Sequence, residues 1–496
     1  LRPPRSTLFP STTLFRSEDH YFGALEEKVA AFMSELDTEL WSMGVAAKTQ
    51  HNEVAPNQFE IACIFSQANI AADANQLVME TLRKVAERHG MAALLHEKPF
   101  AGVNGSGKHV NWSISTNTGL NLLDPPRSFD SEAGGEGARA VARYILFVMA
   151  VIQAVDSRAA LLRASASTAG NDRRLGGNEA PPSIISIFLG EPLTQLFDAL
   201  GNGRKKVNLA ASKIELGVKS LPKLPIDFTD RNRTSPFAYT GNKFEFRMVA
   251  SSQSAATPTM VINAAVAESL SDIAAQLEVS IASGKNPVDA AMEVAGSIWK
   301  KHKRIVFNGN GYSAEWIKEA ATRGLPIFRS AVDAIPEFMK ESNVQVFTKF
   351  GILTVEEAES RCSIYLERYS KQVNIEAGVA LDLARRYILP SASKSAESYA
   401  RAASALAAVA APSVVQEQRS RRIAALTGRV VEEADRLEIA LSDAQRIEDP
   451  LSHAKAYRET VIPRMDSLRE VCDELEKLMP KTDWPLPSYE DLLYSL

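Results

Sequence analysis

The chain has 496 residues without an initial methionine, a length that allows about two to four domains and a sizeable core. Hydrophobic residues make up 45% and charged residues 23%, and the net charge of −4 excludes a generally basic nucleic-acid binder. The three cysteines exclude a disulfide scaffold and favour a reducing compartment, so we expect a cytoplasmic protein.

The first 17 residues, LRPPRSTLFPSTTLFRS, do not resemble natural protein sequence. They contain no continuous apolar stretch and no small-residue cleavage site, which excludes a signal peptide, and three prolines interrupt any amphipathic helix. The run TLFPSTTLFRS looks like a translated sequencing adapter. We therefore exclude residues 1–17 from fold reasoning. Genuine sequence is expected from near Glu18, with the natural N-terminus missing.

Hydrophobic periodicity predicts two helices and a strand in the next part of the chain. Ala24–Met43 carries apolar residues at helical spacing, and so does Ala71–His89, which Gly90 should end. Met91–His96 is a short apolar run and is predicted to be a buried strand.

The middle of the chain contains one strongly apolar segment. Ala138–Ser165 is predicted to form one long buried helix. Its most apolar run, Tyr144–Val155, has 12 residues, whereas a membrane span needs about 20. We therefore expect no membrane association.

From Thr259 onward helical patterns dominate. They are clearest in Ile375–Ile388, Ala396–Ala411 and Val414–Ala444. The tail Trp484–Leu496 contains aromatic residues and prolines, so we expect it to be ordered and held against a surface. The last third of the chain is therefore predicted to be mostly helical.

Gly102–His109, GVNGSGKH, differs from a phosphate-binding P-loop only at its last residue. A P-loop has a hydroxyl there for magnesium, and a helix that binds phosphate follows it. Here His109 replaces the hydroxyl, and the alternation that follows predicts a strand. We therefore reject the P-loop interpretation.

Two predicted strands carry polar residues on one face only. His109–Ser115 places its polar residues on one side and Val110, Trp112 and Ile114 on the other. Lys243–Met248 places Lys243, Glu245 and Arg247 opposite two phenylalanines. Such faces are either solvated sheet surfaces or the lining of a wet cavity, where the carboxylate binds a metal and the cations bind anionic groups.

Glu53 and Glu60 lie seven positions apart, on opposite faces of a straight strand. Pro56 and Asn57 lie between them and favour a bend, which could bring both carboxylates to one side. Carboxylates grouped with a neutral imidazole suit magnesium or manganese. The candidate metal ligands are Glu53, Glu60, His109 and Glu245.

Two polar segments are predicted to be loops that carry arginines. Asn171–Pro182 contains Arg174 and Glu179, and Asp230–Phe237 contains Arg233. Arginine forks suit carboxylates and phosphates. The alternative is that these are ordinary surface arginines.

The segments EVAPNQFEIA, KPFAGVNGSGKHVNWSIS, RLGGNEAPP, DRNRTSPF and NKFEFRMV occur together in the order that is typical of glutamine synthetases. The sequence resembles the type III branch, the long bacterial form, over essentially Glu18–Leu496. The resemblance implies an α+β fold: a catalytic domain with an antiparallel curved sheet or partial barrel over residues 18–312, and a helical C-terminal region over residues 313–496. It also implies that ATP, glutamate and ammonium react to give glutamine through γ-glutamyl phosphate.

The resemblance also assigns roles to residues. Glu53 and Glu60 fall on two glutamates that hold one metal, His109 on the histidine that binds a second, and Glu245 on a further metal glutamate. The cofactors implied are two to three Mg²⁺ or Mn²⁺ ions per site, with ATP as co-substrate. Asn104, Gly105, Arg174 and Arg247 match glutamate-binding positions.

Other matches concern the nucleotide and the ammonium ion. Ser113 and Lys243 match nucleotide-binding positions, and Arg233 matches an arginine that binds substrate and phosphate. Glu179 matches the flap glutamate that closes over the site and takes a proton from ammonium. Ala238 replaces an arginine of the type I enzymes, and Asn111 replaces a histidine.

The family begins with a β-grasp domain and a strand with two metal glutamates, E-x-E in form. No such strand precedes Glu53 in this sequence, because Ala24–Leu40 has helical periodicity instead. We therefore expect a truncated and impaired fragment of a glutamine synthetase.

The family's dodecamer of two rings implies a homo-oligomer. A γ-glutamyl ligase that uses an amine or polyamine stays open as an alternative, as does a non-catalytic regulatory or assembly paralogue. A helical scaffold would explain residues 313–496 alone.

Overall fold

The structure is a computed structural model that describes residues 23–126, 135–177, 180–203 and 234–494. Within them the chain forms two compact units. The first comprises Ala24–His51 and Glu60–Glu359, and the second comprises Gly23, Asn52–Phe59 and Ser360–Leu496. Residues 1–17 lie outside the described part, and the domain boundary after residue 312 stays a prediction.

The first unit contains a mixed sheet with the strand order β3-β6-β5-β4. Its strands are β3 (Gly107–Trp112), β4 (Ile187–Phe188), β5 (Phe237–Tyr239) and β6 (Phe244–Ala250). β6 runs antiparallel to both β3 and β5, while β4 and β5 are parallel. Phe237, Phe244 and Phe246 are completely buried, and the Phe237 ring contacts the rings of both Phe244 and Phe246. The predicted α+β class is confirmed.

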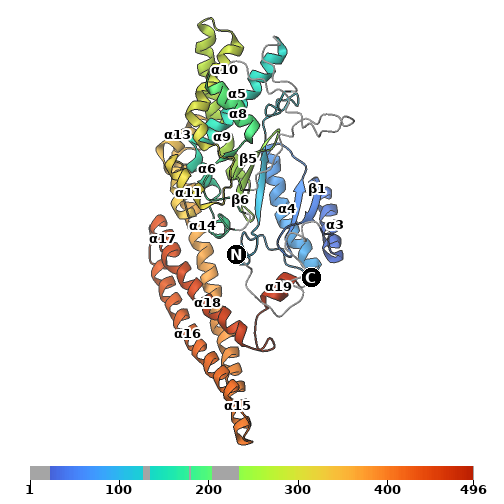
Figure 1. The fold of residues 1–496 in the computed structure, drawn as a ribbon, viewed down its shortest axis with the longest axis vertical. Helices are drawn as coiled ribbons and strands as arrows, with labels where there is room; N and C mark the ends of the chain where they lie inside the picture. Colours follow the sequence, from blue (N-terminus) through green and yellow to red (C-terminus); the bar gives the residue numbers. More distant parts are fainter. Residues whose placement is uncertain (1–22, 127–134, 178–179, 204–233, 495–496) are drawn as a thin grey trace, which may run out of the picture. The chain divides into compact units, whose positions relative to one another are not determined.

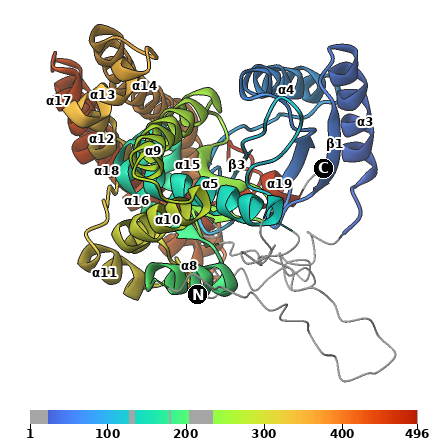
Figure 2. The same ribbon diagram turned by 90° about the horizontal axis from the view of Figure 1, so that it is seen from above.

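The rest of the first unit is mostly helical. Its helices α5, α9 and α10 pack side by side (Figures 1 and 2). The bounds of the helices in this unit are α3 (Glu27–Ser42), α4 (Ala68–Arg88), α5 (Glu136–Ser157), α6 (Ala159–Ser165), α7 (Ala169–Arg174), α8 (Glu191–Gly201), α9 (Ala256–Ala282), α10 (Pro287–His302), η1 (Lys303–Ile305), α11 (Ala314–Thr322), α12 (Ala331–Ala334), η2 (Ile335–Met339) and α13 (Glu341–Lys349).

The long helix that we predicted over Ala138–Ser165 is interrupted at Arg158, where φ is −119°. The Arg158 guanidinium bonds Glu268 at 2.7 and 2.8 Å and Asn343 at 3.1 Å. These tertiary contacts lie far away in sequence, so periodicity gives no sign of the break. By length and composition α5 is the one helix in the described residues that could cross a membrane, and 67% of its most apolar stretch is buried inside the protein.

The prediction of a strand over Met91–His96 is wrong. α4 ends as predicted with Gly90 at a φ of +65°, and the Met91 amide then bonds the Ala86 carbonyl. The residues that follow are irregular, and Leu94 is 62% exposed. A short apolar run does not become a strand when no neighbouring strand offers it a ladder.

A hairpin of β1 (Ala47–Asn52) and β2 (Phe59–Cys63) follows α3. Asn57 lies in its turn with a φ of +55°, a conformation that asparagine tolerates better than most residues. The bend that we predicted from Pro56 and Asn57 is therefore confirmed.

The second unit is built from long helices (Figure 1). They are α14 (Val355–Asp382), which enters it at Ser360, η3 (Leu383–Ile388), α15 (Leu389–Ala408), α16 (Val414–Gln445), α17 (Pro450–Ala456), η4 (Tyr457–Val461), α18 (Ile462–Leu478) and α19 (Tyr489–Tyr494). α16 packs against both α15 and α18, with Ile423, Val430 and Leu437 buried. The helices predicted here are confirmed.

η3 and η4 are π-helical turns, and each directly precedes a helix with proline in its first turn, Pro390 and Pro463. Proline lacks an amide hydrogen and its ring clashes with the carbonyl four residues earlier. A wider turn at that place relieves the clash and lets the helix continue.

The tail is ordered as predicted. The Tyr489 hydroxyl accepts a hydrogen bond from Arg469 at 2.7 Å, and the same guanidinium lies 5.8 Å from the Tyr489 ring centroid. Lys481 pairs with Asp491 at 2.7 Å. Arg469 thus holds the tail against α18, and the pair of Lys481 with Asp491 ties α19 to the segment that follows α18.

Candidate active site

The central feature of the candidate site is a bulge between β3 and β6. Lys108 pairs with Val249 and Val110 pairs with Phe246, so one residue of β3, His109, faces two of β6, Arg247 and Met248. A bulge re-aims side chains and interrupts the ladder of backbone bonds. The strand that we predicted after the glycine-rich segment is present, which removes the structural basis of a P-loop.

His109 and Glu245 come together across this bulge. His109 Nδ1 lies 3.1 Å from Glu245 Oε1, and the side chains are 46% and 10% exposed. The other oxygen of Glu245 accepts bonds from Arg247 Nε at 2.8 Å and Nη2 at 2.5 Å. Burial by itself raises the pKa of Glu245, but the bonds from His109 and Arg247 outweigh it and lower the pKa to about 2.

The charged face of β6 is buried along its whole length, with Glu245 and Arg247 at 8% and 4% exposure. The interpretation of this face as an ordinary solvated sheet surface is therefore wrong. Side-chain alternation tells which residues share a face, but it does not tell whether another layer covers that face.

Helix α7 supplies the hydrogen bonds that the bulge lacks. Arg174 Nη2 donates to the Arg247 carbonyl at 3.0 Å, and Asn171 Nδ2 donates to the Met248 carbonyl at 2.7 Å. Buried backbone carbonyls need partners, so these two side chains stabilise the bulge. We expected a surface loop from Asn171 to Pro182, but Asn171–Arg174 is helical and both of these residues are buried.

Arg174 has its place because residue 107 is glycine. A Cβ atom at Gly107 would lie 2.0 to 2.6 Å from three atoms of the guanidinium. The predicted contact of Arg174 with glutamate stays a prediction, while its bonds to the bulge show a structural function.

Sequence reasoning missed Glu97, which is 2% exposed. Its Oε1 accepts from the Ser252 amide at 2.9 Å and from the Ser252 hydroxyl at 2.5 Å, and its carbonyl accepts from Ser106 at 2.8 Å. A Cβ at Gly105 would lie 2.5 Å from that carbonyl oxygen. Glu97 therefore ties the glycine-rich segment, which also contains Asn104, to the end of β6, and no sequence signal marks it.

The predicted nucleotide-binding residues lie at the other end of the strand pair. Ser113 Oγ is 2.6 Å from Asn121 Oδ1 and 3.1 Å from the Asn242 carbonyl, and Asn121 Nδ2 donates to the same carbonyl at 2.8 Å. Lys243 follows Asn242 in the turn before β6 and is half-buried. Glu179 and Arg233 lie outside the described residues.

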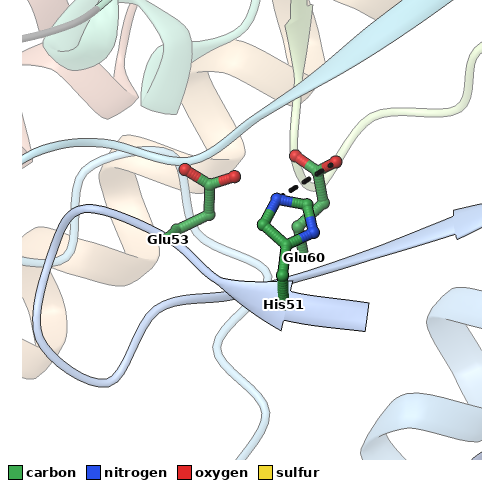
Figure 3. Close-up of side chains that lie close together, drawn as sticks. All are labelled: His51, Glu53 and Glu60. Carbon is green, nitrogen blue, oxygen red and sulfur yellow. Dashed lines mark ion pairs between the residues drawn. The ribbon is translucent and has the colours of Figure 1, made fainter. Parts of the chain in front are cut away.

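A second group of possible metal ligands lies on the hairpin. Figure 3 shows His51, Glu53 and Glu60 close together, and one ligand atom of each lies within 4.8 Å of the others. His51 Nε2 is 3.9 Å from Glu60 Oε1. Sequence reasoning found the two glutamates and missed His51. Its position two residues before Glu53, which directly follows β1, favours the same side of the extended chain for both.

Both groups fit a divalent cation by the chemistry of their donors. Oxygen and imidazole ligands bind such ions at about 2.0–2.2 Å, which places neighbouring ligand atoms roughly 3 Å apart and opposite ones about 4.2 Å apart. The separations of 3.1 Å at His109 and Glu245 and 3.9 Å at His51 and Glu60 lie in this interval. The four predicted ligands thus divide into two pairs, each with a histidine.

Curated relatives are similar to almost the whole chain. A type-3 glutamine synthetase of Dictyostelium discoideum is 40% identical over 96% of this chain and 64% of its own length. A glutamine synthetase of Butyrivibrio fibrisolvens is 40% identical over 97% of this chain and 67% of its own length. A glutamine synthetase of Bacteroides fragilis (strain YCH46) is 37% identical over 96% of this chain and 66% of its own length. The chain thus spans about two thirds of the length of these relatives.

Two family models match parts of the chain. The model of the glutamine synthetase catalytic domain matches residues 6–145, and that of the glutamine synthetase C-terminal domain matches residues 290–407. Among solved structures, the chain is similar to a GmaS/ADP complex. The matched region covers 69% of this chain and 60% of the chain in that structure, with 16% sequence identity and a TM-score of 0.38.

Proposed function

Because the chain belongs to the glutamine synthetase family, we propose that the complete protein joins ammonia to the γ-carboxylate of L-glutamate. ATP transfers its γ-phosphoryl group to that carboxylate, and ammonia then displaces phosphate, so the products are glutamine, ADP and phosphate. The similarity of 40% over 97% of the chain supports this assignment.

The observation that carries the proposal is the gathering of the predicted metal residues into two acid–histidine groups. Glu53 and Glu60 belong to one group, and His109 and Glu245 to the other. Phosphoryl transfer depends mainly on positioning and on neutralising charge, and two cation sites are a common means to both. When bound, Mg²⁺ or Mn²⁺ would offset the negative charge of the phosphates and polarise them.

The residues of the chain would hold and orient the reactants. Glu245 is kept ionised by His109 and Arg247, so it is ready to bind a cation at neutral pH. Arg247 brings a buried positive charge beside it, suited to the carboxylate of glutamate. The glycine-rich segment around Asn104 and Gly105 would let the substrate approach the backbone closely.

The second step would need a base for ammonium. In our proposal Glu179 takes a proton from ammonium, and the nitrogen lone pair attacks the γ-carbonyl carbon of γ-glutamyl phosphate. A carbon–nitrogen bond forms, the bond from that carbon to the phosphate oxygen breaks, and phosphate leaves. The nitrogen releases a second proton to the departing phosphate, which gives the neutral amide of glutamine. Arg233 would balance the charge of the leaving phosphate. Both roles rest on the family resemblance.

The test is an assay of the complete gene product and of this chain with glutamate, ATP and Mg²⁺ or Mn²⁺. We expect glutamine from ammonia and γ-glutamyl hydroxamate from hydroxylamine. Methylamine and putrescine are the matched acceptors for the γ-glutamyl-amine ligase alternative. Product from these amines and none from ammonia would overturn our assignment, and no product from any acceptor would favour a non-catalytic paralogue.

Assembly and location belong to the same proposal. Family membership supports a homo-oligomer, such as a dodecamer, and the reaction needs cytoplasmic ATP. Light scattering after size-exclusion chromatography of the complete product would measure its mass, and a monomer would contradict the oligomer.

A further inference from the structure

We propose that His51 is a direct ligand of the cation held by Glu53 and Glu60, which makes the hairpin a mixed nitrogen and oxygen site. The inference rests on the proposed function for the metal role of the two glutamates. The role of His51 itself comes from the geometry of the hairpin (Figure 3).

The ladder of the hairpin places His51 opposite Glu60. Next to the turn, the Glu53 amide donates to the Gln58 carbonyl at 2.8 Å and so pairs these two residues. Two residues further from the turn on each strand lie His51 and Glu60, whose side chains approach to 3.9 Å across the hairpin. Residues two apart share a face, so His51 also lies beside Glu53.

The separation of His51 and Glu60 suits a shared ion better than a direct contact. His51 Nε2 and Glu60 Oε1 are 3.9 Å apart, which is too long for a hydrogen bond. Two ligands of one cation lie between roughly 3 and 4.2 Å apart when each bond is about 2.1 Å. A cation between the two atoms therefore needs little rearrangement of either strand.

Exposure and charge agree with a working cation site. The His51 and Glu60 side chains are 30% and 45% exposed, which leaves space for water or phosphate oxygens to complete the coordination. Two carboxylates and an imidazole within 4.8 Å of one another offer the donor types that a divalent cation binds.

An imidazole ligand affects metal choice. Mg²⁺ is a hard cation that prefers oxygen, whereas transition metals accept imidazole nitrogen readily. We therefore expect the nitrogen of His51 to strengthen Mn²⁺ binding at the hairpin much more than Mg²⁺ binding.

The test uses Mn²⁺ as a spectroscopic probe, without ATP or glutamate. Because His109 would also bring nitrogen to a metal, the parent protein carries His109→Ala. Electron spin echo envelope modulation should show nitrogen-14 coupling to Mn²⁺ in this parent. The coupling should vanish when His51→Gln is added. The control is His89→Gln, because His89 is a half-buried histidine on the same unit that pairs with Glu35.

Calorimetric titrations give a second readout. His51→Gln should weaken Mn²⁺ binding at the hairpin about tenfold and Mg²⁺ binding less than about threefold, whereas His89→Gln should change neither. Thermal unfolding of the metal-free variants shows whether each one is folded.

Three results would overturn the assignment: no nitrogen coupling in the His109→Ala parent, coupling that persists after His51→Gln, or no Mn²⁺ binding at all. The test is independent of turnover. If the protein made no glutamine but kept the nitrogen coupling, the proposed function would fail while the role of His51 would stand.

Discussion

The two acid–histidine groups differ in how the protein prepares them. At the bulge, Glu245 is buried and already bonded to His109 and Arg247. On the hairpin, Glu53 and Glu60 lie close to each other and more open to solvent. In the first group Glu245 is paired with the buried Arg247 guanidinium, whereas the second group brings two carboxylates and an imidazole within 4.8 Å of one another. The comparison teaches that the same donor types can either support the fold or oppose it slightly until a cation binds.

The largest difference should appear when one glutamate of each group becomes alanine. Glu245→Ala leaves the Arg247 charge buried without its carboxylate, so we expect a loss of about 3–5 kcal/mol in the free energy of unfolding. Glu60→Ala should cost less than about 0.5 kcal/mol, because its side chain is 45% exposed. Both variants should lose activity in the complete protein. Urea unfolding in EDTA measures the stabilities, and equal losses would contradict the comparison.

Gly107→Ala should destabilise the bulge from the other side. The new methyl group would overlap the Arg174 guanidinium, so Arg174 would leave the Arg247 carbonyl, at a cost of about 2–3 kcal/mol. Gly378→Ala is the matched control, since a Cβ atom there meets nothing within 4 Å. Urea unfolding in EDTA measures the stability of both variants. A Gly107→Ala protein as stable as the control would show that Arg174 does not support the bulge.

Acid should remove the stability that ionised Glu245 contributes at the bulge. A carboxyl whose pKa is lowered to about 2 stabilises the fold above the unfolded value of about 4.3, and this contribution is lost as the pH falls toward 2. We expect the free energy of unfolding of the wild type to exceed that of Glu245→Gln by roughly 2 kcal/mol at pH 6. This difference should shrink below about pH 4.3. Denaturant unfolding at a series of pH values measures it. A constant difference would mean that the charge of Glu245 is not the source.

The smallest effect should have the opposite sign. In EDTA, Glu53→Gln removes one of two neighbouring carboxylates, so we expect the metal-free protein to gain up to about 0.5 kcal/mol. Saturating Mn²⁺ should reverse the order, because the variant has lost a ligand. Thermal unfolding of the wild type and the variant, in EDTA and in Mn²⁺, measures these stability differences. If Glu53→Gln were less stable than the wild type in EDTA, the hairpin carboxylates would not oppose the fold as we expect.

Local patterns predicted the strands and the ligand types well. The alternation in His109–Ser115 predicted a strand that the structure has over Gly107–Trp112, three residues shorter at its C-terminal end. Pro56 and Asn57 predicted the bend that the structure has. They did so because each depends on residues that are neighbours in sequence.

Other features depend on partners that are distant in sequence. The break at Arg158 follows from its bonds to Glu268 and Asn343, which are distant in sequence. The burial of the β6 face likewise depends on residues outside β6, such as His109. Arg174 was predicted for a substrate, and only the register of β3 against β6 reveals its bonds to the bulge. His51 was the exception, since its spacing from Glu53 was visible in the sequence.

The bulge also makes β6 one residue longer than the stretch of β3 that it pairs with. Deleting Met248 would therefore give two strands of matched length and a regular ladder. The pairs Lys108–Val249 and Val110–Phe246 would keep their faces, but the Met248 carbonyl that Asn171 binds would be gone. A relative with one residue fewer at this position would keep the sheet and would need a different anchor for Asn171.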